Sequence, residues 1–328
     1  MQVDVRRRQW IVSRALAGLG SCTALPALAA SFEDRSWQDP LRGRTLPWRL
    51  RLPASPGPWP LVLWSHGLGG GREGGEVWGQ AWAAGGLAVL HLQHPGSDTE
   101  TLRGGLRELR AAAAAEQLLA RVGDVRFVLD ELERQHAAAA EPWRSMRLDA
   151  VGLGGHSFGA QTTQAIAGQR FAGGATLGDR RPRAFIAFSP SSPRQAGLSV
   201  AESFGAIVRP FLAITGSADG DPFGSYDGGE PRAQVFEALP PGQRALLWLD
   251  GADHMTFAGS ALRRLPAWGP FRRHEPAAQR QAAQHEIVAR ITTDWWRAQL
   301  LGDAAAAAAR EALQRPAGLA EQDRWRLG

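Results

Sequence analysis

Short apolar runs alternate with stretches of helical periodicity along most of the chain. Seven runs predict strands, at 45–52, 61–65, 87–92, 150–153, 184–188, 211–215 and 245–249. The first alternates apolar and polar residues, which favours the leading edge of a sheet. The others are nearly continuous, and each is followed within a few residues by Gly, Pro, Asp or His. This pattern predicts a mostly parallel sheet with helices on both faces.

Three helices are predicted between and after these strands, at 106–136, 158–169 and 276–301. The first has apolar residues at i, i+3, i+4 and i+7, in positions 125, 128, 129 and 132. The third begins with proline, which suits a first helical turn, and carries Val288, Ile291 and Trp295 on one face. The alanine-rich tail at 303–328 is expected to be helical, so that residues 31–302 form the main domain.

The first thirty residues are expected to be an export signal. R-R-R-Q-W-I at 6–11 resembles a twin-arginine motif, and a weakly apolar stretch follows with small residues at 27–30. Removal of this segment would leave a periplasmic or secreted protein. An alternative stays open, because L-G-S-C at 19–22 resembles a lipoprotein cleavage box that would leave Cys22 lipidated. No later segment is apolar enough to predict a membrane span.

Composition narrows the class of protein further. A hydrophobic content of 44% is that of a globular chain with a sizeable core. All 37 basic residues are Arg, and four of them lie in the first thirty residues, so the rest of the chain is nearly neutral. This distribution argues against nucleic-acid binding. The absence of cysteine after Cys22 excludes an intrachain disulfide, a thiolate zinc site and a cysteine nucleophile.

The sharpest chemical signal is G-H-S-F-G at 155–159, between a predicted strand and a predicted helix. A serine presented on such a tight strand-to-helix turn has a strained backbone, and the helix passes close to the strand. Only very small residues fit two positions to either side. The turn would expose the Ser157 hydroxyl beside the N–H groups of a helix N-terminus, which predicts that Ser157 is a nucleophile.

A serine nucleophile needs a base, and in this arrangement the base follows last in the chain. Three histidines lie downstream of Ser157. His254 stands in a loop just after the predicted strand 245–249, whereas His274 lies in a charged loop and His285 in a helical pattern. We therefore expect His254 to be the base.

The base in turn needs an acid to orient its ring. Asp219 follows the strand 211–215, one strand before the one that precedes the histidine, which is the expected position. Asp221, Asp250 and Asp253 are its rivals, although Asp253 is adjacent to the histidine in sequence and badly placed to reach its ring. We expect Asp219 to be the orienting acid.

An oxyanion hole requires two N–H donors. The residue after the nucleophile, Phe158, should supply one. The second is expected from Leu68 in H-G-L-G-G at 66–70, a glycine-rich loop after the first long strand. His66 would shape this loop without acting as a base.

Further signals are weaker. Five phenylalanines near strand ends or loops could form an apolar acyl pocket or could equally be core; they are Phe158, Phe188, Phe204, Phe223 and Phe257. His91 and His94 lack a third ligand, and the aspartates from 219 to 227 match no calcium loop. The sequence therefore predicts no metal and no cofactor.

Several motifs together resemble a known family. They are H-G-L-G at 66–69, H-P-G-S-D at 94–98, G-H-S-F-G-A at 155–160, S-P-S-S-P at 189–193 and D-H-M at 253–255. Over about residues 35–300 the chain resembles the bacterial predicted dienelactone hydrolases, which are similar to the plasma type of platelet-activating factor acetylhydrolase. The resemblance implies an α/β-hydrolase fold with about eight strands and a calcium-independent serine esterase. True dienelactone hydrolases use cysteine where this chain has Ser157, so the family label does not indicate lactone substrates.

The expected function is hydrolysis of small-molecule carboxylic esters through an acyl-enzyme on Ser157. A peptidase or amidase with the same three residues stays open, because the difference lies in the leaving-group pocket. A catalytically silent relative that binds a ligand is the alternative from another class. The oligomeric state and the natural substrate do not follow from the sequence.

Overall fold

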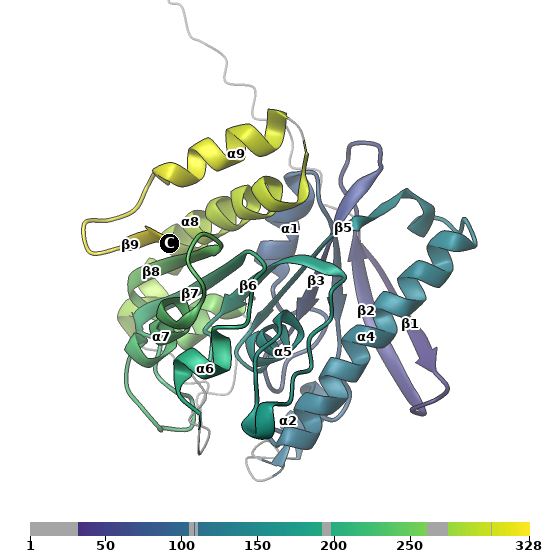
Figure 1. The fold of residues 1–328 in the computed structure, drawn as a ribbon, viewed down its shortest axis with the longest axis horizontal. Coiled ribbons are helices and arrows are strands. Elements are labelled where there is room, and N and C mark those ends of the chain that lie inside the picture. Colours follow the sequence, from purple (N-terminus) through teal and green to yellow (C-terminus); the bar gives the residue numbers. More distant parts are fainter. Residues whose placement is uncertain (1–31, 105–107, 109–110, 192–197, 261–274, 303) are drawn as a thin grey trace, which may run out of the picture.

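The computed structural model describes residues 32–104, 108, 111–191, 198–260, 275–302 and 304–328. The expected export signal with Cys22 and the rejected candidate His274 lie outside these residues. Within them, a central sheet is flanked by helices on both sides (Figure 1).

One nine-stranded sheet has the order β1-β2-β4-β3-β5-β6-β7-β8-β9. The strands are β1 Phe32–Asp39, β2 Arg44–Arg51, β3 Trp59–Ser65, β4 Ala88–Leu92, β5 Met146–His156, β6 Pro182–Phe188, β7 Phe211–Ala218, β8 Arg244–Asp253 and β9 Arg324–Leu327. Strands β4, β3, β5, β6, β7 and β8 run parallel, while β1, β2 and β9 pair antiparallel with their neighbours. The prediction of a mostly parallel sheet is confirmed, and each of the seven predicted strands overlaps an observed one.

Helices cover the two faces of this sheet. They are α1 Glu76–Ala84, α2 Thr99–Arg103, α4 Ala115–Ala137, α5 Phe158–Ala167, α6 Val200–Phe204, α7 Glu230–Ala238, α8 Glu275–Leu300 and α9 Ala304–Gln314, with short 3₁₀ turns η1 Trp143–Ser145, η2 Ala172–Gly174 and η3 His254–Ala258. Helices α4, α5, α6 and α7 pack on one face, and α1, α8 and α9 lie on the other (Figure 1).

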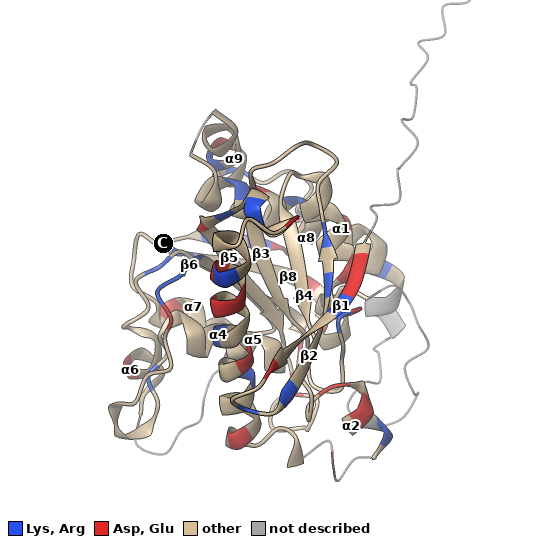
Figure 2. Ribbon diagram, turned by 90° about the vertical axis from the view of Figure 1, so that its right-hand side faces the viewer, with Lys and Arg blue, Asp and Glu red and all other residues tan. Residues whose placement is uncertain are grey.

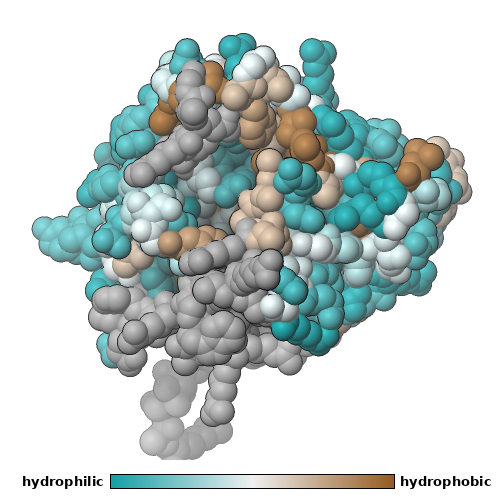
Figure 3. Space-filling view, turned by 90° about the horizontal axis from the view of Figure 1, so that it is seen from below, coloured by the Kyte–Doolittle hydropathy of each residue, from teal (hydrophilic) through white to brown (hydrophobic). Residues whose placement is uncertain are grey.

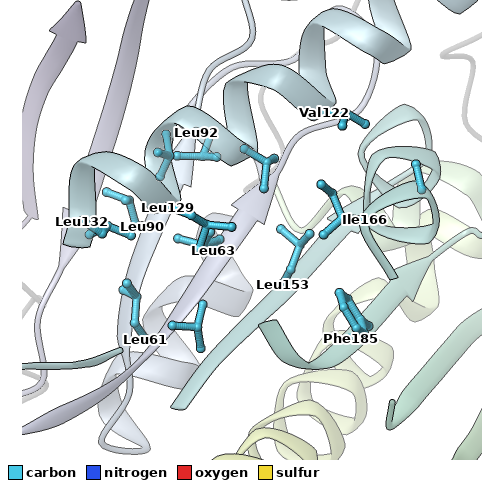
Figure 4. Packing of buried hydrophobic residues seen from close by; sticks show 14 of the residues in the cluster. Leu61, Leu63, Leu90, Leu92, Val122, Leu129, Leu132, Leu153, Ile166 and Phe185 are labelled. Carbon is cyan, nitrogen blue, oxygen red and sulfur yellow. The ribbon is translucent and has the colours of Figure 1, made fainter. Parts of the chain in front are cut away.

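The apolar faces predicted from periodicity are buried. In α4, Val125, Val128, Leu129 and Leu132 are each at most 3% exposed and pack against leucines of β3 and β4 (Figure 4). In α8, Val288, Ile291 and Trp295 are likewise buried, against the opposite face. A buried side chain of this size contributes about 1.5–3 kcal/mol relative to exposure. Two apolar layers therefore fix the sheet from both sides.

The two ends of the sheet differ from expectation. The strand expected at the leading edge is β2, and β1 pairs outside it. The sequence of β1, F-E-D-R-S-W-Q-D, is mostly polar because an edge strand is largely solvated, so it carries no apolar run to predict it. The expected 106–136 helix is interrupted: residues 108 and 111 are helical, a turn follows at 112–114, and α4 then runs from Ala115 to Ala137.

The tail is not entirely helical. After α9 the chain turns and forms β9, which pairs antiparallel with β8 and extends the sheet. Trp325 of β9 donates its indole N–H to the Leu313 carbonyl at 2.7 Å and packs on the helical layer. The four-residue strand R-W-R-L is too short to be predicted beside an alanine-rich helix, and it makes the tail part of the main fold.

The surface carries both signs of charge. Acidic and basic residues are interleaved on the face that Figure 2 shows. Among the residues that Figure 3 colours, hydrophilic ones predominate, with smaller hydrophobic patches between them. Among the described residues, no helix has the length and apolar character needed to cross a membrane.

Candidate active site

Ser157 lies on the tight turn between β5 and α5. Its backbone has φ 56° and ψ −112°, a conformation that is strained for a residue other than glycine. Its N–H donates to the Phe188 carbonyl at the end of β6, at 3.0 Å, which holds the turn against the sheet. A Cβ atom on Gly159 would lie 1.9 Å from the Ser65 carbonyl oxygen, and one on Gly155 would lie 2.4 Å from the Gly159 oxygen. The glycines of the motif are therefore required by close packing of α5 on β3 and β5.

The structure brings the three predicted residues into contact. The Ser157 hydroxyl oxygen lies 2.9 Å from His254 Nε2, and His254 Nδ1 lies 2.8 Å from Asp219 Oδ1. His254 begins η3 directly after β8, and Asp219 follows β7, so both stand where parallel strands end at one edge of the sheet. Asp219 also accepts the Thr215 hydroxyl at 2.9 Å. The carboxylate fixes the proton on Nδ1 and leaves Nε2 free to accept from the serine.

The rival residues have other partners. Asp253 caps η3 by accepting from the backbone N–H and the hydroxyl of Thr256, each at 2.8 Å. Asp250 accepts the Ser217 hydroxyl at 2.8 Å, and Asp221 accepts the Ser225 N–H at 3.0 Å. His285 lies 2.8 Å from the Thr256 carbonyl oxygen. None of these contacts involves Ser157.

A buried arginine of α7, Arg232, lies behind the acid. Its Nε is 3.1 Å from Asp219 Oδ1, and Nη2 is 3.3 Å from His254 Nδ1. The same guanidinium donates to the carbonyl oxygens of Asp219, Ser189, Pro190 and Gly220. Arg232 was not predicted from the sequence, since nothing in the polar sequence of α7 indicates that one arginine points inward.

Burial and neighbouring charges shift the pKa values of both His254 and Asp219. Burial lowers the pKa of His254 from its ordinary value, Asp219 opposes that effect, and Arg232 adds to the lowering. Burial would raise the pKa of Asp219, but Arg232 and His254 outweigh it, so that the pKa of the carboxyl is lowered. Near neutral pH the imidazole is therefore neutral and the carboxylate is charged, which is the state that a general base requires.

His156, inside the serine motif, holds the segment that carries the base. Its Nε2 lies 2.9 Å from the His254 carbonyl oxygen, and the two rings are 4.7 Å apart between centroids. Burial lowers the pKa of His156 well below its ordinary value, so the ring is neutral and donates one hydrogen bond. The contact links the serine turn directly to the histidine loop.

Leu68 and Phe158 also lie beside Ser157. Leu68 lines the same cavity as the Ser157 hydroxyl, and Phe158 begins α5, where the first N–H groups have no partner within the helix. Within the part of the chain that the structure describes, neither backbone N–H has a hydrogen-bond acceptor. Both N–H groups are thus available to a bound oxygen.

A cavity of about 110 Å³ opens in front of the serine. Its lining consists of Trp64, His66, Gly67, Leu68, Gly69, Gly70, Gly74, His156, Ser157, Pro222, Phe223, His254, Met255, Ala258 and Ser260. Of the five phenylalanines considered for an acyl pocket, only Phe223 lines it. The other four are buried among core residues; they are Phe158, Phe188, Phe204 and Phe257.

A second Ser–His–Asp arrangement lies behind the 66–70 loop. The Ser65 hydroxyl oxygen is 3.0 Å from His94 Nε2, and His94 Nδ1 is 3.0 Å from Asp124 Oδ2. Arg42 and Arg44 bind the same carboxylate at 2.9 and 2.8 Å. This cluster was not predicted from the sequence. A signal for it was present, because two charged residues three positions apart, Arg121 and Asp124, lie on the apolar face of α4.

The sheet order, the flanking helices and the serine turn together define an α/β-hydrolase fold. Two solved structures similar to this chain share it. A 2,6-dihydroxy-pseudo-oxynicotine hydrolase is 17% identical, with a TM-score of 0.52 over 84% of this chain and 69% of that one. A cold-adapted esterase from an Arctic intertidal metagenomic library is 17% identical, with a TM-score of 0.50 over 79% of this chain and 94% of that one. No family model and no curated protein matches the sequence.

Proposed function

We propose that this protein is a serine hydrolase that cleaves carboxylic esters. The observation that carries the proposal is the chain of contacts from Ser157 through His254 to Asp219 at the wall of a mainly apolar cavity. The strained serine turn and the unpaired N–H groups of Leu68 and Phe158 support it. The esterase among the similar structures agrees with this reaction class but, at its low identity, is evidence for the fold alone.

In the proposed reaction the Ser157 hydroxyl attacks the ester carbonyl while His254 Nε2 takes its proton. The ring becomes a cation, which Asp219 stabilises through the Nδ1 hydrogen bond. The carbonyl oxygen becomes negatively charged and accepts hydrogen bonds from the N–H groups of Leu68 and Phe158. One such donor is worth about 3–4 kcal/mol in the transition state.

Collapse of this intermediate breaks the bond to the alcohol oxygen. The Nε2 proton moves to the leaving alcohol, and Ser157 carries the acyl group. Water then enters, gives a proton to the neutral His254 and attacks the acyl carbon. The same two N–H groups hold the second oxyanion, and the proton returns to Ser157 as the acid departs.

Hydrolysis of p-nitrophenyl esters of increasing acyl length tests the proposal, with Ser157→Ala as the matched variant. We expect turnover with a length optimum and a loss of at least about 10⁴-fold in kcat/KM in the variant. An organophosphorus probe should label the wild type at Ser157 and leave the variant unlabelled. Equal activity of the two proteins would exclude Ser157 as the nucleophile. Labelling without ester turnover would direct the search to amides, and no reaction at all would favour a ligand-binding relative.

Export stays a proposal that rests on residues 1–30 alone. We propose that R-R-R at 6–8 directs the chain out of the cytoplasm, as a cleaved or lipidated protein. Replacing Arg6, Arg7 and Arg8 by Lys should then retain the full-length chain inside the cell, as fractionation would measure.

A further inference from the structure

The peptide group between Gly67 and Leu68 is held by its carbonyl end. The Gly67 oxygen lies 2.6 Å from His66 Nδ1 and accepts the Gly70 N–H at 3.0 Å. Arg121 Nη2 approaches the same oxygen to 3.5 Å. In a trans peptide the C=O and N–H bonds point in opposite directions. Holding the Gly67 oxygen therefore fixes the direction of the Leu68 N–H, and Leu68 lines the cavity in front of Ser157.

The first of these contacts depends on which nitrogen of His66 carries the proton. The backbone N–H of His94 donates to His66 Nε2 at 3.0 Å, so Nε2 is an acceptor and the proton is on Nδ1. Nδ1 can then donate to the Gly67 oxygen. Burial, together with the nearby Arg121, keeps the pKa of His66 well below its ordinary value, so the ring stays neutral.

Arg121 joins the two segments that carry the proposed oxyanion donors. It donates through Nη1 to the His66 carbonyl oxygen at 2.6 Å and through Nε to the Ser97 hydroxyl at 2.8 Å. Its guanidinium carbon lies 4.4 Å from the centre of the Phe158 ring. The side chain is fully buried, where an arginine is costly unless it is well hydrogen-bonded. Its pKa falls to about 9 because of burial, so it is still a cation at neutral pH.

We propose that Arg121 is a positioning residue of the oxyanion hole, which aims the Leu68 N–H by holding the carbonyl groups of His66 and Gly67. Arg121 touches neither the substrate nor the reacting atoms, and its effect on the reaction passes through the loop. The inference rests on the proposed function, because it concerns the hydrogen bond that Leu68 gives to the developing oxyanion.

The test compares an ester with its thionoester, in which sulfur replaces the carbonyl oxygen. Sulfur is a weak hydrogen-bond acceptor, so a working oxyanion hole favours the oxygen ester and a damaged one loses that preference. For Arg121→Met we expect kcat for the oxygen ester to fall about 10- to 100-fold with little change in KM. The ratio of oxygen ester to thionoester rates should fall by a similar factor.

Arg232→Met is the matched control, because it removes a buried arginine from the other side of Ser157. Arg232 contacts Asp219 and His254 and does not contact the 66–70 loop. We expect its removal to slow both substrates by a similar factor, so that their ratio stays within about twofold of the wild type. A general loss of stability would act in the same way.

Two results would overturn the inference. One is a folded Arg121→Met variant with wild-type kcat, and the other is one that slows both substrates equally. Should Arg121→Met show no cooperative thermal transition, Ser97→Ala decides the question, since it removes the hydroxyl that accepts from Arg121 Nε at 2.8 Å and otherwise donates to the His94 carbonyl oxygen at 3.3 Å. A fallen ratio in Ser97→Ala supports the inference, and an unchanged ratio overturns it. Failure of the proposed function is recognised separately, by full activity in Ser157→Ala or by a wild type that hydrolyses no ester.

Discussion

The two Ser–His–Asp arrangements in this molecule have nearly the same hydrogen-bond lengths and very different surroundings. Ser157, His254 and Asp219 are joined by contacts of 2.9 and 2.8 Å, and Ser65, His94 and Asp124 by contacts of 3.0 and 3.0 Å. In both, the histidine presents Nδ1 to the carboxylate and Nε2 to the serine. Distances among these side chains therefore do not distinguish the proposed catalytic group from the buried one.

Solvent access to the serine and strain in its backbone do distinguish the two arrangements. Ser157 is partly exposed on a turn with positive φ and lines a cavity. Ser65 is the last residue of the regular strand β3, and Ser65, His94 and Asp124 are at most 1% exposed. No substrate can reach the second serine. Burial, with Arg121 nearby, lowers the pKa of His94 to about 4, so its ring is a neutral spacer between the serine and the carboxylate.

Substituting the two aspartates separates the two roles most strongly. Asp219→Asn should lower kcat/KM by about 10⁴-fold, because an amide no longer holds the Nδ1 tautomer of His254. Asp124→Asn should instead cost about 3 kcal/mol of unfolding free energy, since Arg42 and Arg44 lose the buried carboxylate that they share. Ester kinetics and thermal unfolding of both variants check the pair.

The comparison would be wrong if the two variants behaved alike. A 10⁴-fold loss of activity in a stable Asp124→Asn variant would mean that the buried arrangement takes part in the chemistry. A stable and fully active Asp219→Asn variant would remove the orienting role from Asp219.

Reactivity of the two serines gives a second, smaller contrast. Ser65→Ala should keep full labelling by an organophosphorus probe at Ser157, because Ser65 has no exposed surface for the probe to reach. Its expected cost is about 1 kcal/mol in unfolding free energy, from the lost hydrogen bond to His94. Mass spectrometry of the labelled peptides measures the site, and labelled Ser65 in the wild type would contradict the prediction.

Much of the fold follows from the sequence because its periodic elements are also its most buried ones. The strands from β2 to β8 and the apolar face of α4 were predicted on that basis. The edge strands β1 and β9 were not, since solvated strands need no apolar run and are stabilised by pairing with a neighbour.

The residues of the candidate site also fall into a predicted and an unpredicted group. Ser157, Asp219 and His254 follow strands whose ends meet at one edge of a parallel sheet, so their positions in the sequence already predicted their contact. Arg232 and Arg121 lie on helices α7 and α4. The role of each depends on its side chain pointing into the interior, which the sequence of a helix does not reveal. The Ser65 arrangement joins β3, a loop and α4, which only the packed structure brings together.

The smallest predicted effect concerns Arg232, the cation behind Asp219. Arg232 lies beside His254 and lowers its pKa, so the charged form of the ring is disfavoured. The acid limb of kcat/KM reports this group in the free enzyme, and its midpoint should lie below the ordinary value of 6.5, with activity lost as pH falls through it. Arg232→Met removes the neighbouring positive charge and makes protonation of His254 easier, which moves the midpoint upward. A pH profile of ester hydrolysis for both proteins measures the shift. A midpoint that moved downward would show that Arg232 acts mainly by keeping Asp219 ionised, since loss of that carboxylate charge would lower the pKa of the ring.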